Sequence, residues 1–248
     1  EPIDTEMNAE VQTLEEADLS MNSRTSLVNK LMFNTAPLPG DSSYNAAYFN
    51  KLYENLKARL LEGASEGTLD FYYGLYYQQA LADSINGNFT SYEINKAEAE
   101  KILDVQVSKY QLRAESIEID EALRRMVYNA VYDEINMNSF NFINATYDDL
   151  FFRFPTDSEF NSAYEVVEFN QPNIVMGELA NNKIEYVNII INNSEFDEGM
   201  IIWAYESLLA RSPTSNEVFD LIPNFQETND FQRVQRLIMI SDEYAGFD

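Results

Sequence analysis

One sequence motif occurs twice in this chain, and it sets the strongest constraint on the fold. Tyr147 begins the string YDDLFFRFPTDSEF and Tyr205 begins YESLLARSPTSNEV, so Tyr, Leu, Arg, Pro, Thr and Glu recur in register 58 residues apart. Recurrence of this kind is typical of chains that stack one supersecondary unit on the next. We therefore predict an all-α fold, a stacked helical repeat or bundle, with the motif YxxLxxRxPTxxE in each copy.

Each copy of the motif predicts a corner between two helices. An apolar turn runs to an arginine, the following proline stops the helix, and Thr-x-x-Glu supplies a capping box for the next one. The corner residues are Arg153, Pro155, Thr156 and Glu159 in the first copy and Arg211, Pro213, Thr214 and Glu217 in the second. We predict a structural role for all eight, with each arginine bound to helix-end carbonyls or paired with the glutamate of its corner.

The repeat continues downstream of each corner. The two copies, residues 147–196 and 205–244, both close on an apolar helical run followed by Ser and by Glu with an aromatic residue. Residues 126–135 are similar to this closing helix and lead into the first copy. The repeat register also predicts a helix, and not a strand, for the apolar run 187–191.

The repeated motif, with its closing S-x-E-aromatic helix, resembles helical modules of bacterial envelope and secreted proteins, including the planctomycete-type families DUF1549, DUF1553 and DUF4214. The resemblance covers residues 124–248. It implies a helical fold and an envelope or secreted location, and it implies no activity. Haem-binding partners sometimes fused to the planctomycete modules need C-x-x-C-H, which this chain cannot supply because it has neither Cys nor His.

The remaining chain predicts three regions. Residues 1–22 are acidic and predict a flexible tether or a loosely docked helix. Residues 23–115 form an N-terminal helical region, and residues 116–248 contain the repeats. Apolar periodicity and cap residues predict further helices over 44–63, 68–86, 91–104 and 116–137.

Charge limits the partners. The chain has 42 Asp and Glu against 16 Lys and Arg, a net charge of −26. Nucleic acids and anionic membranes are bound through basic patches, so this balance predicts neither as a partner. No run of about eighteen apolar residues is present, which predicts no direct membrane span. Because the sequence begins at Glu1, a removed leader and a lipid anchor on a preceding Cys are further expectations.

The absence of Cys and His limits the chemistry. It excludes thiolate nucleophiles, His-based triads and His-ligated zinc, and we predict no enzyme, no metal and no cofactor. A carboxylate pair for glycoside hydrolysis is the alternative, but it needs two acids converging in a cleft. With so many acids on polar helix faces, a solvated surface is the favoured interpretation.

Residues 81–93 contain two weak signals. Gly87 and Glu93 have the spacing of positions six and twelve of a calcium loop, but Ala82 stands where the first acid ligand belongs, so we predict a helix end and a new helix start. Asp83-Ser84-Ile85 resembles the O-glycosylation site of Bacteroidota. Whether Ser84 carries a glycan is left open.

Tyr72, Tyr73, Tyr76 and Tyr77 are the candidate binding residues. They could build an aromatic platform for a glycan or peptide, although a helix buried between neighbours is the favoured interpretation. The leading functional hypothesis is a non-enzymatic protein–protein interaction module, an accessory subunit of a bacterial cell-envelope or surface assembly whose partners are other envelope proteins. The alternative is a glycan-binding surface protein. In either case we expect export to the periplasm or cell surface.

Overall fold

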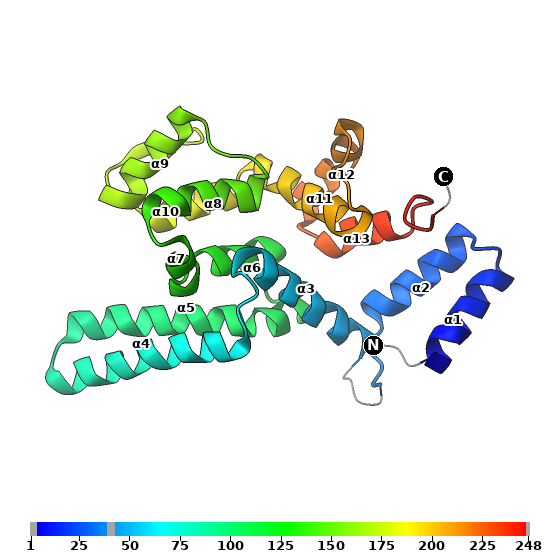
Figure 1. Cartoon of the computed structure of the whole chain (residues 1–248), viewed down its shortest axis with the longest axis horizontal. Coiled ribbons are helices and arrows are strands. Elements are labelled where there is room, and N and C mark those ends of the chain that lie inside the picture. The colour runs from blue at the N-terminus through cyan, green and yellow to red at the C-terminus, as the bar shows by residue number, and fades with distance from the viewer. Residues whose placement is uncertain (1–3, 39–42, 247–248) are drawn as a thin grey trace. The chain divides into compact units, whose positions relative to one another are not determined.

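The computed structural model describes residues 4–38 and 43–246, and it confirms the all-α prediction: these residues form thirteen helices and one small sheet (Figure 1). The chain divides into two compact units, Glu1–Phe49 with Ile201–Asp248 and Asn50–Met200. Helices α3 (Tyr44–Leu60) and α11 (Ser194–Leu209) contribute residues to both units. Among the described helices, none has the length and apolar character to cross a membrane.

The first unit contains four further helices around an aromatic core. They are α1 (Asp4–Glu16), α2 (Met21–Phe33), α12 (Ser215–Thr228) and α13 (Phe231–Met239). Trp203 stacks on Phe231 with ring centroids 5.3 Å apart, and both are largely buried. Arg24 of α2 donates to the carbonyl of Ser241 and to the carboxylate of Asp242, which holds the chain after α13 against α2.

Most of the described part of the acidic N-terminal segment is helical. Helix α1 covers most of the residues predicted as a tether or a docked helix, and residues 1–3 lie outside the described range. Glu10 of α1 pairs with Lys30 of α2 at 2.5 Å. An acid in this segment therefore has a lysine partner within the same unit.

The second unit contains seven further helices and the sheet. They are α4 (Glu66–Asn86), α5 (Phe89–Arg113), α6 (Ile119–Val127), α7 (Ala130–Asn136), α8 (Ser139–Phe151), α9 (Asp157–Phe169), β1 (Asn173–Val175), β2 (Glu178–Ala180) and α10 (Lys183–Ile191). Fully buried tyrosines mark its core: Tyr53, Tyr132, Tyr147 and Tyr186. Helix α10 confirms the helix predicted for residues 187–191.

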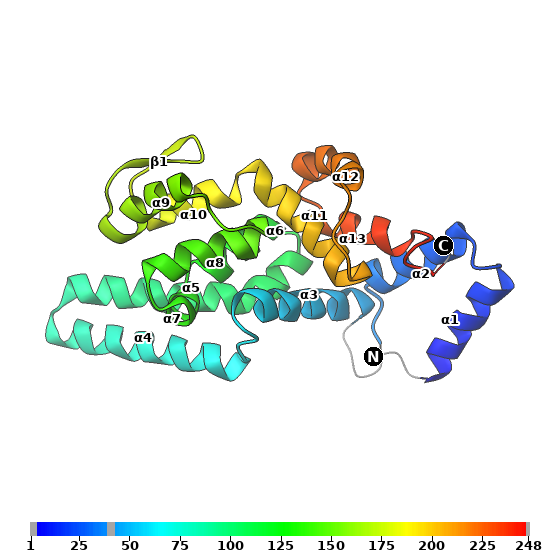
Figure 2. The same ribbon diagram turned by 45° about the horizontal axis from the view of Figure 1, so that its top comes forward.

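Helices α4 and α5 form a long antiparallel hairpin, with α4 on its outer side (Figures 1 and 2). Gly87 ends α4 in the left-handed conformation, as its position predicted. The predicted helix 91–104 was wrong at both ends, because Asn88 occupies the N-cap position and α5 continues to Arg113. Buried residues beyond residue 104, such as Val105 and Leu112, keep the later turns packed.

The single helix predicted over 116–137 was also wrong, because the chain breaks between α6 and α7 at Asn129. Its side-chain oxygen accepts from the backbone N–H groups of Val131 and Tyr132, and its amide donates to the carbonyls of Arg125 and Met126. One buried side chain thus ends α6 and caps α7. The sequence pattern did not separate the two helices because both carry apolar residues in nearly continuous helical register.

A hairpin between α9 and α10 was not predicted. Strands β1 and β2 pair antiparallel, with Asn173 opposite Ala180 and Val175 opposite Glu178. Met176 and Gly177 form the two-residue turn, and both have positive φ, 48° and 90°. Such a turn is the usual short connection between antiparallel strands.

The two motif copies adopt the same local geometry at their corners. Thr156 and Thr214 each accept from the backbone N–H three residues on, and each receives the returning glutamate in a full capping box. Arg153 donates to both carboxylate oxygens of Glu159, and Arg211 does the same with Glu217. Both arginines also bond the carbonyl of the residue that follows them.

Each corner arginine also binds a second glutamate that the sequence analysis left unassigned. Arg153 donates through Nε and Nη2 to Glu195, and Arg211 donates in the same way to Glu243. These glutamates belong to the closing segments, SEF over residues 194–196 in the first copy and SDEY over residues 241–244 in the second. In both copies the end of the repeat therefore returns to the corner at its start.

Candidate functional site

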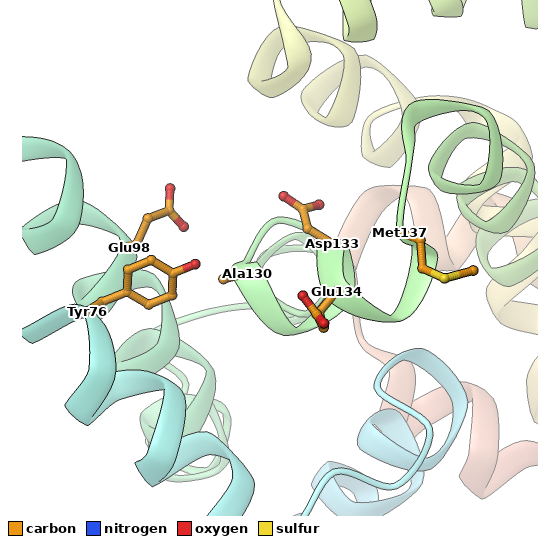
Figure 3. Close-up of a pocket in the computed structure, with 6 residues that line it drawn as sticks. All are labelled: Tyr76, Glu98, Ala130, Asp133, Glu134 and Met137. Carbon is orange, nitrogen blue, oxygen red and sulfur yellow. The ribbon is translucent and has the colours of Figure 1, made fainter. Parts of the chain in front are cut away.

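The candidate site is an open cleft in the second unit between the α4–α5 hairpin and α7. Tyr76 of α4 and Glu98 of α5 face the start of α7 at Ala130, and Asp133 and Glu134 follow on the same short helix (Figure 3). Met137, directly after α7, completes the lining. The cleft has a volume of about 370 Å³.

Local sequence explains why these residues gather. Asn129 starts α7 directly after α6, and α7 lies against both α4 and α5. The helix ends after Asn136 because Met137 adopts positive φ, 60°. Asp133 and Glu134 are thus exposed residues of a short helix that faces the hairpin, and Met137 leaves 77% of its surface exposed.

Carboxylates dominate the electrostatics of the cleft. Glu98 accepts from Lys101 at 2.7 Å, and Asp133 accepts from Lys183 of α10. Burial, together with the carboxylates of Glu98 and Asp133, raises the pKa of Tyr76. Its hydroxyl is therefore a neutral donor and acceptor at physiological pH.

This arrangement suits a cationic side chain. Three carboxylates, a phenol ring and a thioether line the cleft, and these are groups that receive an ammonium or guanidinium group together with its apolar stem. Met137 adds a flexible apolar contact that adapts to the shape of a partner. Within the described ranges, no cluster of three or more acidic residues is placed to hold a metal ion.

The four candidate tyrosines do not share one surface. Tyr76 lines the cleft, Tyr72 packs edge-on against Phe71, and Tyr73 and Tyr77 stack on each other with centroids 5.7 Å apart. Tyr77 is 44% exposed, so this helix is not buried on all sides as the favoured interpretation expected. All eight corner residues lie outside the cleft lining, and the arginines, threonines and glutamates among them form ion pairs and capping boxes.

Sequence reasoning singled out one cleft residue, Tyr76, and missed Glu98, Asp133, Glu134 and Met137. The acids were counted among the solvated helix faces. The signal available was the string DEINM over 133–137, where two acids and a methionine end a helix directly before the Asn138 cap of α8. Their meeting with Tyr76 depends on tertiary packing.

Comparison with known proteins found no matching family model, no matching curated protein and no matching solved structure. The resemblance of residues 124–248 to envelope modules stays a prediction. The argument for function therefore rests on the site itself.

Proposed function

We propose that this chain is a non-enzymatic protein–protein interaction module that receives a basic segment of another protein in the cleft beside α7. The observation that carries the proposal is that Glu98, Asp133 and Glu134 line one cleft together with Tyr76 and Met137. Two of these carboxylates pair with lysines of the same chain, Glu98 with Lys101 and Asp133 with Lys183, which supports an ammonium group as the kind of ligand.

The whole chain favours the same class of partner. A net charge of −26 attracts a basic protein over distance, which raises the rate of encounter. The cleft then supplies the short-range contacts that distinguish one basic segment from another. We further propose that the partner belongs to a bacterial envelope assembly and that the chain is exported, a proposal that rests on the resemblance of residues 124–248.

A basic amphipathic peptide of alternating Lys and Leu, followed by fluorescence anisotropy, tests the cleft directly. Glu134→Gln should weaken its binding by about three- to tenfold, because it removes a cleft carboxylate without changing side-chain size. Glu93→Gln on α5 is the matched control, since Glu93 is exposed and lies outside the cleft lining. Equal losses in both variants would mean that the peptide responds to net charge alone, and would remove support for the cleft.

Glycan binding is the second candidate, and the exposed, stacked pair Tyr73 and Tyr77 is the observation that favours it. Retardation in polysaccharide-containing native gels, abolished by Tyr77→Ala, would support this function. Recovery of a defined basic protein with the native chain, but not with Glu134→Gln, would support the first proposal instead.

A further inference from the structure

The outer face of α4 carries an exposed apolar stripe. Phe71, Leu75, Ala82 and Ile85 form it, and with the polar Gln78 at their centre they follow one another at alternating spacings of four and three residues. Phe71 is 64% exposed and Ile85 is 85% exposed. This spacing is that of a seam along which one helix packs on another.

The second unit leaves this stripe uncovered by the residues that the structure describes. Helix α4 buries the opposite side, where Leu69 and Ala80 are almost inaccessible. Figures 1 and 2 both place α4 on the outer side of the hairpin, and its contacts with α5 and α7 lie on its inner side. The stripe is therefore not a contact of the unit with itself.

The charge of the residues around the stripe indicates which partner could cover it. The residues that flank it, Tyr72, Gly74, Gln79, Leu81 and Asn86, are all uncharged. A basic partner would require acids here, and a chain with net charge −26 has them on most other faces. A second copy of the same acidic chain, in contrast, meets least repulsion along an uncharged face.

The order of the side chains along α4 also fits a second copy of the chain. The stripe and its flanks are symmetric about Gln78: Phe71 and Ile85 lie seven residues away on either side, Gly74 and Ala82 four, and Leu75 and Leu81 three. In an antiparallel pair centred on Gln78, Phe71 lies beside Ile85 of the second copy. Leu75 then lies beside Leu81 of the second copy, and the small residues Gly74 and Ala82 lie beside each other. Self-complementarity of this kind is what a two-fold interface requires.

Gly74 supports close approach of another helix. Glycine in a helix interior is destabilising, and a Cβ added at Gly74 would meet no atom of the chain within 4 Å. The fold of this chain therefore gives no packing reason for glycine at that position. The approach of a second α4 helix, with its Ala82 beside Gly74, gives one.

We propose that two copies of this chain associate through an antiparallel, two-fold pairing of their α4 helices centred on Gln78. The seam is about 21 Å long at 1.5 Å per residue, which is short for an interface. It buries less than the roughly 800 Å² per partner of a stable complex, so the dimer is weak and depends on concentration. It uses a different face from the cleft, and neither proposal depends on the other.

Sedimentation equilibrium of the full chain over rising concentration tests the association. The mass should move from 28.6 kDa towards twice that value. Ile85→Lys should weaken dimerisation at least about tenfold, because it places a charge in the seam. Ile94→Lys is the matched control: Ile94 is an exposed isoleucine of the same hairpin, on α5 and outside the stripe, and its substitution should leave dimerisation unchanged.

A cross-link tests the register. Because the chain contains no Cys, Gln78→Cys introduces a single thiol, which in the proposed dimer lies next to its own symmetry mate and should oxidise to a disulfide-linked dimer. Ser84→Cys, exposed on another side of α4, should remain monomeric under the same conditions. The proposal is overturned by a wild-type chain that stays monomeric at every concentration. It is equally overturned if Ile94→Lys is as damaging as Ile85→Lys, or if both thiols cross-link alike.

Discussion

Arg153 and Arg211 each hold two glutamates and lie against a tyrosine ring. The guanidinium carbon is 5.1 Å from the ring centroid of Tyr147 in the first case and of Tyr205 in the second. Hydrogen bonds from the arginines lower the pKa of Glu159 and of Glu217 to about 2. The stabilisation from these carboxylates is present above their ordinary pKa near 4.3 and is lost as pH falls towards 2.

The second corner gives a prediction about the cap. Thr214→Ala should lower the free energy of unfolding by about 0.5 to 2 kcal/mol, because the threonine oxygen accepts from the backbone N–H of Glu217. Ser215→Ala is the control, since Ser215 is the exposed first residue of α12, and its effect should be small. Chemical denaturation measures both. A silent Thr214→Ala with a costly Ser215→Ala would contradict the assigned cap.

Asp149 affects stability with a pH dependence opposite to that of Glu159 and Glu217. Burial raises its pKa to about 6, although the hydroxyl of Tyr132 donates to it at 2.8 Å. Between about pH 4 and pH 6 the folded chain keeps a proton that the unfolded chain has lost, so stability falls as pH rises through this window. Asp149→Asn keeps an acceptor for Tyr132 and removes the cost of a buried charge.

We expect Asp149→Asn to be more stable than wild type at pH 7.5 by on the order of 1 to 3 kcal/mol. The difference should shrink towards pH 4, where the wild-type carboxyl is protonated. Denaturant midpoints at the two pH values measure it. A variant less stable than wild type at both would mean that the carboxylate is stabilised by contacts that the amide cannot replace.

At the scale of elements, α11 passes very close to the end of α8 at Gly199. A Cβ built on Gly199 would lie 1.9 Å from the carbonyl oxygen of Leu150, closer than any side-chain carbon tolerates. Gly199→Ala should therefore force the two helices apart and destabilise the chain by about 1 to 3 kcal/mol. Gly74→Ala is the control, because the space around that Cβ is open and alanine favours the helix. The melting temperature should fall for Gly199→Ala. For Gly74→Ala, the melting temperature of the isolated chain should be unchanged or higher.

Local signals predicted the elements well where both partners of a contact lie within a few residues. The caps at Thr156 and Thr214 and the end of α4 at Gly87 are of this kind. The break at Asn129 was missed because the outcome depends on that side chain being buried, which follows from packing. The outer face of α4 shows the same limit, since an apolar stripe in a sequence does not reveal whether another helix covers it.

The candidate site, like the break at Asn129, depends on packing between elements. Tyr76, Glu98 and Asp133 come from three helices and meet through the packing of α7 on the hairpin. The Arg153–Glu195 pair likewise joins residues 42 apart. For the cleft, the sequence showed only acids on helix faces, which are common in this chain. For the Arg153–Glu195 pair, the repeat contained part of the signal, because each copy has a corner arginine and a closing glutamate, although the two are 42 residues apart in the first copy and 32 in the second.

At the scale of the whole molecule, self-repulsion among carboxylates opposes folding. The chain has 42 acids and 16 basic residues, so at least 26 carboxylates have no cation of their own. A charge excess of this size destabilises a compact state, and salt screens it with a Debye length of about 10 Å at 0.1 M. Salt also weakens exposed ion pairs, but each contributes only about 0 to 1 kcal/mol.

We therefore expect the melting temperature to rise with sodium chloride between low ionic strength and about 0.5 M, since screened repulsion outweighs the weakened pairs. Sucrose in place of salt provides the control, because it favours burial without screening charge. The salt response should diminish as pH approaches the isoelectric point near 4.1, where the net charge that salt screens has vanished. A melting temperature that falls with salt at neutral pH would mean that networks such as Arg153 with Glu159 and Glu195 contribute more to stability than the excess charge takes away.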